Sequence, residues 1–218
     1  MQRLMAALVL AAGLAGCDTA AVRQAVTAPT IVPSERPGIG ATVLSALPGI
    51  QPGMTLAWSG QTQSDEWTAA TLEALQTEGV SLLSAMPADV LEYCPGYSRQ
   101  SPQDRAAFWA GFLSKVASVE SGWNPLAKRG DAVGMLGITP RVAQSHGCSA
   151  SLLDVRENLK CGVRIMARNV VRDGTIGGTD ADGASRGWRG VTRDWLSLRS
   201  AARRSDVASW TRRQSYCR

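Results

Sequence analysis

Glu120 is the carboxylate of this sequence best placed for acid–base chemistry. It follows Trp109, Leu113 and Val116 at helical spacings, so it continues the apolar face of a predicted helix. Gly122 ends that helix, and the negative end of the helix dipole then lies beside the carboxyl group. Desolvation and the dipole both raise the pKa of a carboxyl group, and general-acid catalysis needs a carboxylic acid that keeps its proton near neutral pH. Periodicity alone leaves open that Glu120 is an ordinary terminal glutamate that turns to solvent.

The helix that must carry this carboxylate has a clear start. Ser101, Pro102 and Asp104 supply a capping hydroxyl, a first-turn proline and a first-turn acid. The helix is therefore expected to run to about Ser121.

A second capped helix is expected from Asp154 to about Arg172, with Glu157 in its first turn. No strand pattern is evident, so the predicted fold class is mainly α. The remaining expected elements are helices over 67–76, 80–85 and 191–202 and a loop over 180–189.

Composition limits the kinds of site this chain can hold. The 218 residues are 44% hydrophobic and 19% charged, which fits one globular domain with appendages and excludes a collagen-like or wholly disordered chain. Five cysteines and a single histidine, His146, form no C-x-x-C pair and no ligand cluster. We therefore expect no metal and no cofactor, and we interpret His146 as a turn or packing residue.

Charge is unevenly distributed along the chain. Residues 1–104 carry 4 Arg against 9 acidic residues, whereas residues 105–218 carry 19 Lys and Arg against 9 acidic residues. A basic half suits an anionic polymer, but the arginine-rich tail 186–218 lacks a nucleic-acid fold signature, so no nucleic-acid partner is expected. A basic stripe on the second helix favours a solvated face, with attraction to envelope polymers as the alternative. Its members are Arg156, Lys160, Arg164, Arg168 and Arg172.

The N-terminus has the layout of a secretory signal peptide over residues 1–16. Its last residues, Leu14-Ala15-Gly16, precede Cys17 and resemble the lipobox of bacterial lipoproteins, in which the cysteine carries a diacylglyceryl group. The resemblance implies a periplasmic protein of a Gram-negative bacterium, anchored through Cys17 to the outer or inner membrane. An ordinary signal peptide with an incidental cysteine is the alternative. Residues 17–63 are expected to form a linker, although Trp58 suggests that its end docks on the domain.

Lipidation of Cys17 would leave four cysteines in an oxidising compartment, which allow three pairings. Proximity favours a bridge between Cys148 and Cys161, leaving Cys94 with Cys217. The second bridge would tie the start of the domain to its C-terminus.

Three motifs in order resemble the family of SLT-type lytic transglycosylases. They are Glu120-Ser121 followed by Trp123-Asn124-Pro125, then the stretch from Gly134 to Pro140, then Asn158-Leu159-Lys160-Cys161-Gly162. The similarity covers about residues 101–199 and implies a lysozyme-like helical domain over 94–218, preceded by a helical lead-in over 64–93.

The resemblance also implies roles for individual residues. Glu120 would be the sole general acid/base, Ser121 would orient it or the sugar, and Asn158 and Trp188 would contribute to substrate binding. Two departures from the family are present: Gly137 stands where the family usually has Gln, and the late Tyr-Asn-Ala-Gly segment is missing. Trp188 or Trp195 is expected to replace its tyrosine. The expected cleft wall consists of Gly134, Met135, Leu136, Gly137 and Ile138.

The activity implied by the resemblance is cleavage of peptidoglycan glycan strands between N-acetylmuramic acid (MurNAc) and N-acetylglucosamine (GlcNAc), with a 1,6-anhydro-MurNAc end formed by the sugar's own 6-hydroxyl. Two alternatives stay open: a muramidase that uses water, and a degenerate domain that binds glycan or scaffolds an envelope complex. A water-using glycosidase normally needs a second carboxylate. Asp154 and Glu157 are explained as a helix cap. Asp131 is expected to be a loop residue, with a role as a second acid as the alternative.

Overall fold

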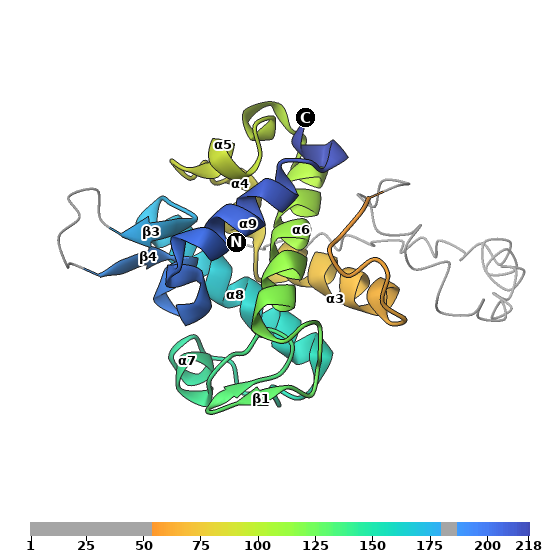
Figure 1. Ribbon diagram of the computed structural model, residues 1–218, viewed down its shortest axis with the longest axis vertical. Helices are drawn as coiled ribbons and strands as arrows, with labels where there is room; N and C mark the ends of the chain where they lie inside the picture. Colours follow the sequence, from red (N-terminus) through yellow and green to blue (C-terminus); the bar gives the residue numbers. More distant parts are fainter. Residues whose placement is uncertain (1–53, 180–186) are drawn as a thin grey trace, which may run out of the picture. The chain divides into compact units, whose positions relative to one another are not determined.

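A computed structural model of the chain describes residues 54–179 and 187–218 (Figure 1). The expected signal peptide, Cys17 and the first part of the linker lie outside these residues. Within the described part, no helix has the length and apolar character needed to cross a membrane. The helices are α3 (Ser64–Thr77), α4 (Val80–Ser84), α5 (Val90–Tyr93), α6 (Pro102–Glu120), α7 (Pro140–Ser145), α8 (Val155–Asp173) and α9 (Ala201–Thr211). Short 3-10 turns are η2 (Tyr97–Arg99), η3 (Val191–Arg193), η4 (Leu196–Arg199) and η5 (Ser215–Cys217).

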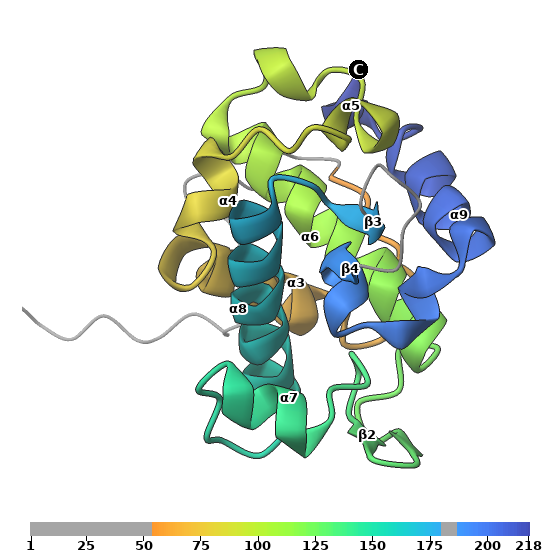
Figure 2. The ribbon, with the colours of Figure 1, turned by 90° about the vertical axis from the view of Figure 1, so that its left-hand side faces the viewer.

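Helix α6 is the central element, and it begins as the sequence predicts. The Ser101 hydroxyl accepts a hydrogen bond from the Asp104 backbone N–H at 3.1 Å, and Pro102 occupies the first turn. Its middle is buried on almost every side, because α3, α9 and η5 all pack against it. Figures 1 and 2 show α6 running through the middle of the folded part, with α8 beside it.

Aromatic side chains fill the core at the start of α6. Phe108 and Trp109 are fully buried, and their ring centroids lie 4.8 Å apart. Tyr97 stacks edge-on against Phe108 at 5.3 Å, and its hydroxyl accepts a hydrogen bond from the Trp109 indole at 2.9 Å. Tyr93 meets Phe112 at 5.7 Å. This cluster fixes the first half of α6 and so determines where its other end, at Glu120, emerges.

Helix α8 is also capped as expected. The Asp154 carboxylate accepts from the backbone N–H groups of Arg156 and Glu157 at 2.9 and 3.1 Å, and Gly174 ends the helix with φ +67°. Its buried face packs on α3 and α4.

Two antiparallel strand pairs were not predicted. β1 (Lys128–Arg129) pairs with β2 (Ala132–Val133), and β3 (Gly177–Thr179) pairs with β4 (Trp188–Gly190). Each strand has two or three residues, which is too short for an alternating pattern to be visible in the sequence.

Two boundaries predicted from the sequence were wrong. The expected linker over 17–63 ends too late, because Leu56 and Trp58 are buried in the core and the Trp58 indole donates to the Thr68 hydroxyl at 3.0 Å. The suggestion that Trp58 docks on the domain is thereby confirmed. The helix expected over 191–202 is instead two 3-10 turns, and the helix proper begins at Ala201.

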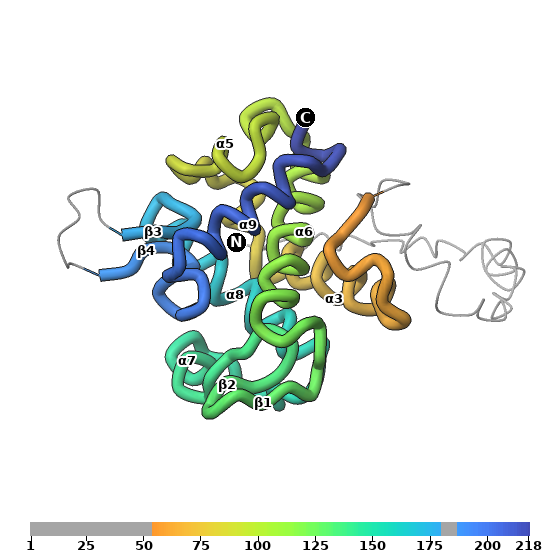
Figure 3. The backbone as a smooth tube through the Cα atoms, in the orientation of Figure 1, coloured from red at the N-terminus to blue at the C-terminus, as the bar shows by residue number. Residues whose placement is uncertain are grey.

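Both predicted disulfides are confirmed. Cys94 pairs with Cys217, with their Cα atoms 4.7 Å apart, and Cys148 pairs with Cys161 at 5.8 Å. The tube in Figure 3 shows the C-terminus lying beside the segment after α5, where the first bridge and a backbone hydrogen bond from Gly96 to Cys217 close the domain.

Candidate active site

Glu120 is the last residue of α6, and the chain turns sharply after it. Gly122 and Trp123 both have positive φ values, +64° and +62°. Trp123 is the one non-glycine residue in the described part with such a φ, and its indole anchors it by donating to the Ser114 carbonyl at 3.0 Å. The turn leaves the Glu120 side chain half-buried at the surface of the helix end.

The Glu120 carboxyl group is held by a residue that the sequence did not indicate. The Ser197 hydroxyl, from η4, donates a hydrogen bond to Oε1 of Glu120. Burial raises the pKa of Glu120, and the hydrogen bond from Ser197 and the charges of Arg203 and Arg129 lower it by less. The pKa is therefore raised above its ordinary value, as the position of Glu120 on an apolar helix face predicted.

A tight turn over residues 134–138 lies against this carboxyl group. Gly137 has φ +57°, and a Cβ atom placed on it would lie 3.1 Å from Oε2 of Glu120. Gly134 has φ +77°, and a Cβ there would lie 2.3 Å from the Asn158 amide. Both positions therefore suit glycine alone. An isolated bridge between Val133 and Ile138 closes the turn.

Asn158, fully buried on α8, holds the turn from behind. Its Oδ1 accepts from the Leu136 N–H at 2.9 Å, and its Nδ2 donates to the carbonyls of Val133 and Leu152 at 3.2 and 3.0 Å. Gly162, one helical turn further on, is so close to Leu136 that a Cβ on it would lie 2.1 Å from Leu136 Cδ1. The third motif thus supports the second.

Two further side chains join the turn to its neighbours. The Ser121 hydroxyl donates to the Met135 carbonyl at 2.7 Å and accepts from the Asn124 N–H at 3.1 Å. The Trp195 indole donates to the Leu136 carbonyl at 2.8 Å. Ser121, Trp195 and the turn therefore form one unit around Glu120.

Not every predicted site residue reaches the surface. Met135, Leu136 and Asn158 have no exposed surface and Ile138 has 2%, so in this conformation they support the cleft wall and cannot touch a glycan. Trp188, on β4, is partly exposed, and the Arg199 guanidinium lies 5.2 Å from the centre of its ring. Gly134 is buried as well. A direct role in substrate binding stays a prediction for Ser121, Gly137 and Trp188.

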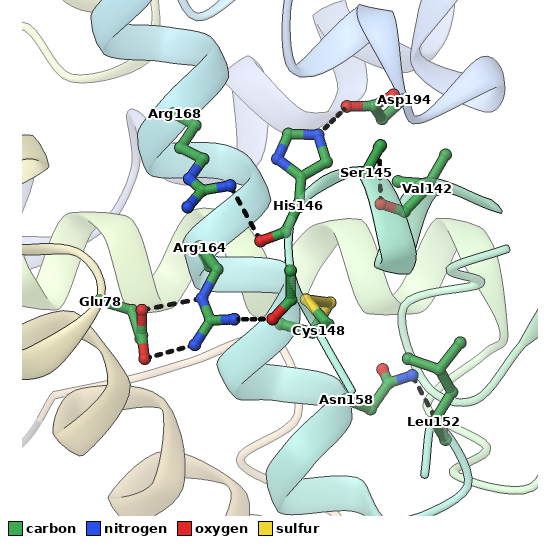
Figure 4. The surroundings of a disulfide bond; sticks show 12 residues. Glu78, Val142, Ser145, His146, Cys148, Leu152, Asn158, Arg164, Arg168 and Asp194 are labelled. Atoms are coloured by element: carbon green, nitrogen blue, oxygen red, sulfur yellow. Dashed lines mark hydrogen bonds and ion pairs between the residues drawn. A yellow bond between two sulfur atoms is a disulfide. The ribbon is translucent and has the colours of Figure 1, made fainter. Parts of the chain in front are cut away.

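The basic stripe of α8 is only in part the solvated face that the sequence favoured: Arg156, Arg168 and Arg172 are exposed, whereas Arg164 is half-buried. Arg164 forms a bidentate ion pair with Glu78, at 2.7 and 2.8 Å, and donates to the Gly147 carbonyl; Arg156 pairs with Glu66. Figure 4 shows Arg164 between Glu78 and the segment that leads to Cys148. The stripe thus joins α8 to its neighbours, because glutamates that precede it in the chain by 86 to 90 positions lie opposite it.

An open groove of about 1040 Å³ lies along the same side of α8. There Nε2 of His146 lies 2.9 Å from the Asp194 carboxylate, which also accepts from Asn169 at 2.7 Å (Figure 4). Burial alone would raise the pKa of Asp194, but these hydrogen bonds lower it below its ordinary value. His146 is buried, in agreement with a packing role.

Among the described residues no cluster of three His, Cys, Asp or Glu side chains could hold a metal ion.

Residues 99–179 match the model of the transglycosylase SLT domain. This part of the chain is thus similar to the SLT-type lytic transglycosylases. The matched residues include Glu120, the glycine turn and Asn158, and they end before Trp195 and Ser197.

Solved structures give the same result for the fold. The chain is similar to the structure of DslA in its wild-type form 2, with a TM-score of 0.68 and 28% identity over 75% of this chain and 98% of that chain. Two mutants of DslA, each with one glutamate changed to glutamine, match with TM-scores of 0.67. Among curated protein sequences none matches this chain. The helix-dominated fold is thus the lysozyme-like SLT fold, whose family members are lytic transglycosylases that act on peptidoglycan.

Proposed function

We propose that this protein is a peptidoglycan lytic transglycosylase that cleaves the β-1,4 bond between MurNAc and GlcNAc and leaves a 1,6-anhydro-MurNAc end. The observation that carries this proposal is the environment of Glu120. Burial raises the pKa of Glu120, whereas the pKa values of Glu78, Asp173 and Asp194 are lowered, and Glu120 lies beside the turn of the second SLT motif. A protonated carboxyl group in such a place is suited to general-acid catalysis.

The two oxygens of Glu120 have different surroundings, which suggests how it works. Ser197 binds Oε1, whereas Oε2 faces Gly137, where no side chain intervenes. In the proposed mechanism Glu120 donates its proton to the glycosidic oxygen as the bond from that oxygen to C1 of MurNAc breaks, assisted by the 2-acetamido group. The 6-hydroxyl of the same sugar then attacks C1, and Glu120 takes the proton that this hydroxyl releases. Glu120 ends protonated, as it began.

This reaction needs neither water nor a second carboxylate, because the nucleophile is part of the substrate. Its proximity supplies much of the rate enhancement. Gly137 fits the scheme: a larger residue there would bring its Cβ within 3.1 Å of Oε2, the atom assigned to proton transfer.

One observation favours a second candidate, a muramidase that uses water. The two glutamates replaced in the DslA mutants are 11 positions apart, and Glu120 and Asp131 have the same separation. Asp131 is exposed in the turn between β1 and β2, next to Ala132, whose Cβ lies 3.8 Å from the Cβ position of Gly137. In this scheme Asp131 would act on the attacking water as the second carboxylate.

Product analysis on purified peptidoglycan separates the two candidates. A lytic transglycosylase releases muropeptides that end in 1,6-anhydro-MurNAc, one water lighter than the reducing ends that a muramidase releases. We expect anhydro ends from the wild-type protein, and the same ends at an unchanged rate from Asp131→Asn. Reducing ends that disappear in Asp131→Asn would assign the protein to the muramidases.

We also propose that the domain works in the periplasm on a lipid anchor at Cys17. The support comes from the sequence: the lipobox-like residues 14–17 follow an apolar stretch and precede a linker. An anchored enzyme with a linker would reach the glycan strands near its membrane.

A further inference from the structure

Two arginines, Arg129 and Arg203, approach Glu120 from different elements. Arg129 belongs to β1, where it pairs with Ala132 of β2. The Cβ of Ala132 lies 3.8 Å from the Cβ position of Gly137, which in turn lies 3.1 Å from Oε2 of Glu120. The β1–β2 hairpin therefore lies next to Gly137, the residue that Oε2 of Glu120 faces.

Arg203 arrives on α9, which runs antiparallel to α6. Trp210 lies over Gly111, where a Cβ would lie 3.4 Å from the indole ring, and Lys115 forms an ion pair with Asp206 at 2.9 Å. The two helices therefore run in opposite directions, as Figure 1 shows. Arg203, one turn before Asp206, lies at the Glu120 end.

Both arginines are exposed, and neither guanidinium group donates a hydrogen bond to, or forms an ion pair with, another side chain that the structure describes. Other arginines do have such partners: Arg156 and Arg164 bind glutamates of the α3 region. The charges of Arg129 and Arg203 act on Glu120, whose pKa they lower. Cations work against an acid that must stay protonated, so catalysis by Glu120 alone gives no reason for them.

We infer that Arg129 and Arg203 bind a carboxylate carried by the muramic acid residue at the scissile bond. Guanidinium groups pair with carboxylates through two parallel hydrogen bonds, and here two of them lie beside the proposed proton donor. Muramic acid carries such a group on its lactyl ether, either free or linked to a peptide with carboxylates of its own. The inference rests on the proposed function, since it names the substrate class of the same site.

Binding of this carboxylate would also assist the chemistry. A substrate anion between the arginines neutralises the charges that favour ionisation of Glu120, so the proton is held more firmly when the correct glycan is bound. A neutral oligomer of GlcNAc leaves the arginines unneutralised. The cleft would therefore discriminate between muramic acid strands and chitin-like strands by charge.

The test is binding, measured by calorimetry in the Glu120→Gln background so that cleavage does not interfere. The ligands are a peptide-free glycan oligosaccharide with free lactyl carboxylates, its peptide-bearing form, and a GlcNAc oligomer of equal length. We expect Arg129→Gln and Arg203→Gln each to weaken binding of a carboxylate-bearing ligand about fivefold, with no effect on the neutral oligomer. The ligand that responds identifies the source of the carboxylate.

Arg212→Gln is the matched control, because Arg212 is equally exposed but lies at the opposite end of α9. Equal weakening for charged and neutral ligands, or an effect no larger than that of Arg212→Gln, would overturn the inference. The proposed function fails separately: if the wild-type protein cleaves no peptidoglycan but the binding pattern appears, the carboxylate site stands and the transglycosylase assignment falls.

Discussion

Replacing Asn158 with alanine tests whether the glycine turn depends on one buried side chain. The change removes three hydrogen bonds, from the Leu136 N–H and to the carbonyls of Val133 and Leu152. Leu136 has no exposed surface, so its N–H would be left without a partner. The amide also touches Gly134, where a Cβ would lie 2.3 Å from Nδ2, so its removal opens a void behind the turn.

The stability cost can be worked out from these contacts. A buried N–H without a partner costs about 1–3 kcal/mol, and the two partly accessible carbonyls cost less because water replaces the amide. We expect Asn158→Ala to lower the free energy of unfolding by about 3 kcal/mol, and the melting temperature by about 6–12 °C for a domain of this size. Urea denaturation followed by circular dichroism measures the change.

The loss of activity should exceed what destabilisation alone produces, because the turn positions Gly137 against Glu120. Leu75→Ala is the matched control: Leu75 is fully buried on α3, and its truncation costs about 2–5 kcal/mol without touching the turn. At a temperature where both variants are folded, we expect Asn158→Ala to cleave peptidoglycan much more slowly than Leu75→Ala. A stability loss below about 1 kcal/mol, or equal activity of the two variants, would refute the reasoning.

Three further predictions concern the hydroxyl group at the site, the disulfide beside it and the anchor. Ser197→Ala removes a hydrogen bond that lowers the pKa of Glu120, so the pKa rises and the basic limb of the kcat/KM pH profile should move to higher pH; a limb that stays in place would contradict the contact. Replacing Cys148 and Cys161, 13 positions apart, with alanine should lower the free energy of unfolding by about 3 kcal/mol, and urea titration of the oxidised wild-type protein gives the reference. Cys17→Ala should move the protein from the detergent phase to the aqueous phase, and wild-type protein that already partitions into the aqueous phase would exclude the anchor.

The sequence predicted those parts of the site that depend on local patterns. Glu120 could be placed at a helix end on an apolar face because periodicity and the following glycine define both. The caps at Ser101 and Asp154 follow from residue types that satisfy helix N–H groups, and both are confirmed. The Cys148–Cys161 bridge was found because closeness in the chain matches proximity in space, and Cys94–Cys217 then followed as the remaining pair.

Contacts between distant segments could not be predicted in this way. Ser197 reaches Glu120 across 77 positions, from a 3-10 turn whose sequence carries no signal for that contact. The ion pair of Arg164 could not be predicted, because its partner Glu78 precedes it by 86 positions. The sequence suggested that Trp58 docks on the domain, but its burial depends on the whole core and not on the residues next to it in the chain.

The activity and stability of Glu120→Gln, measured together, test the central claim most directly. The amide is nearly isosteric but cannot donate and then accept a proton, so we expect peptidoglycan cleavage to fall by at least about 10²- to 10⁴-fold. Because folding raises the pKa of Glu120, its ionised form opposes folding at neutral pH, and the variant should unfold at the same temperature or higher. Glu92→Gln, the same change at an exposed position, is the control and should keep full activity. Full cleavage by folded Glu120→Gln would contradict the account.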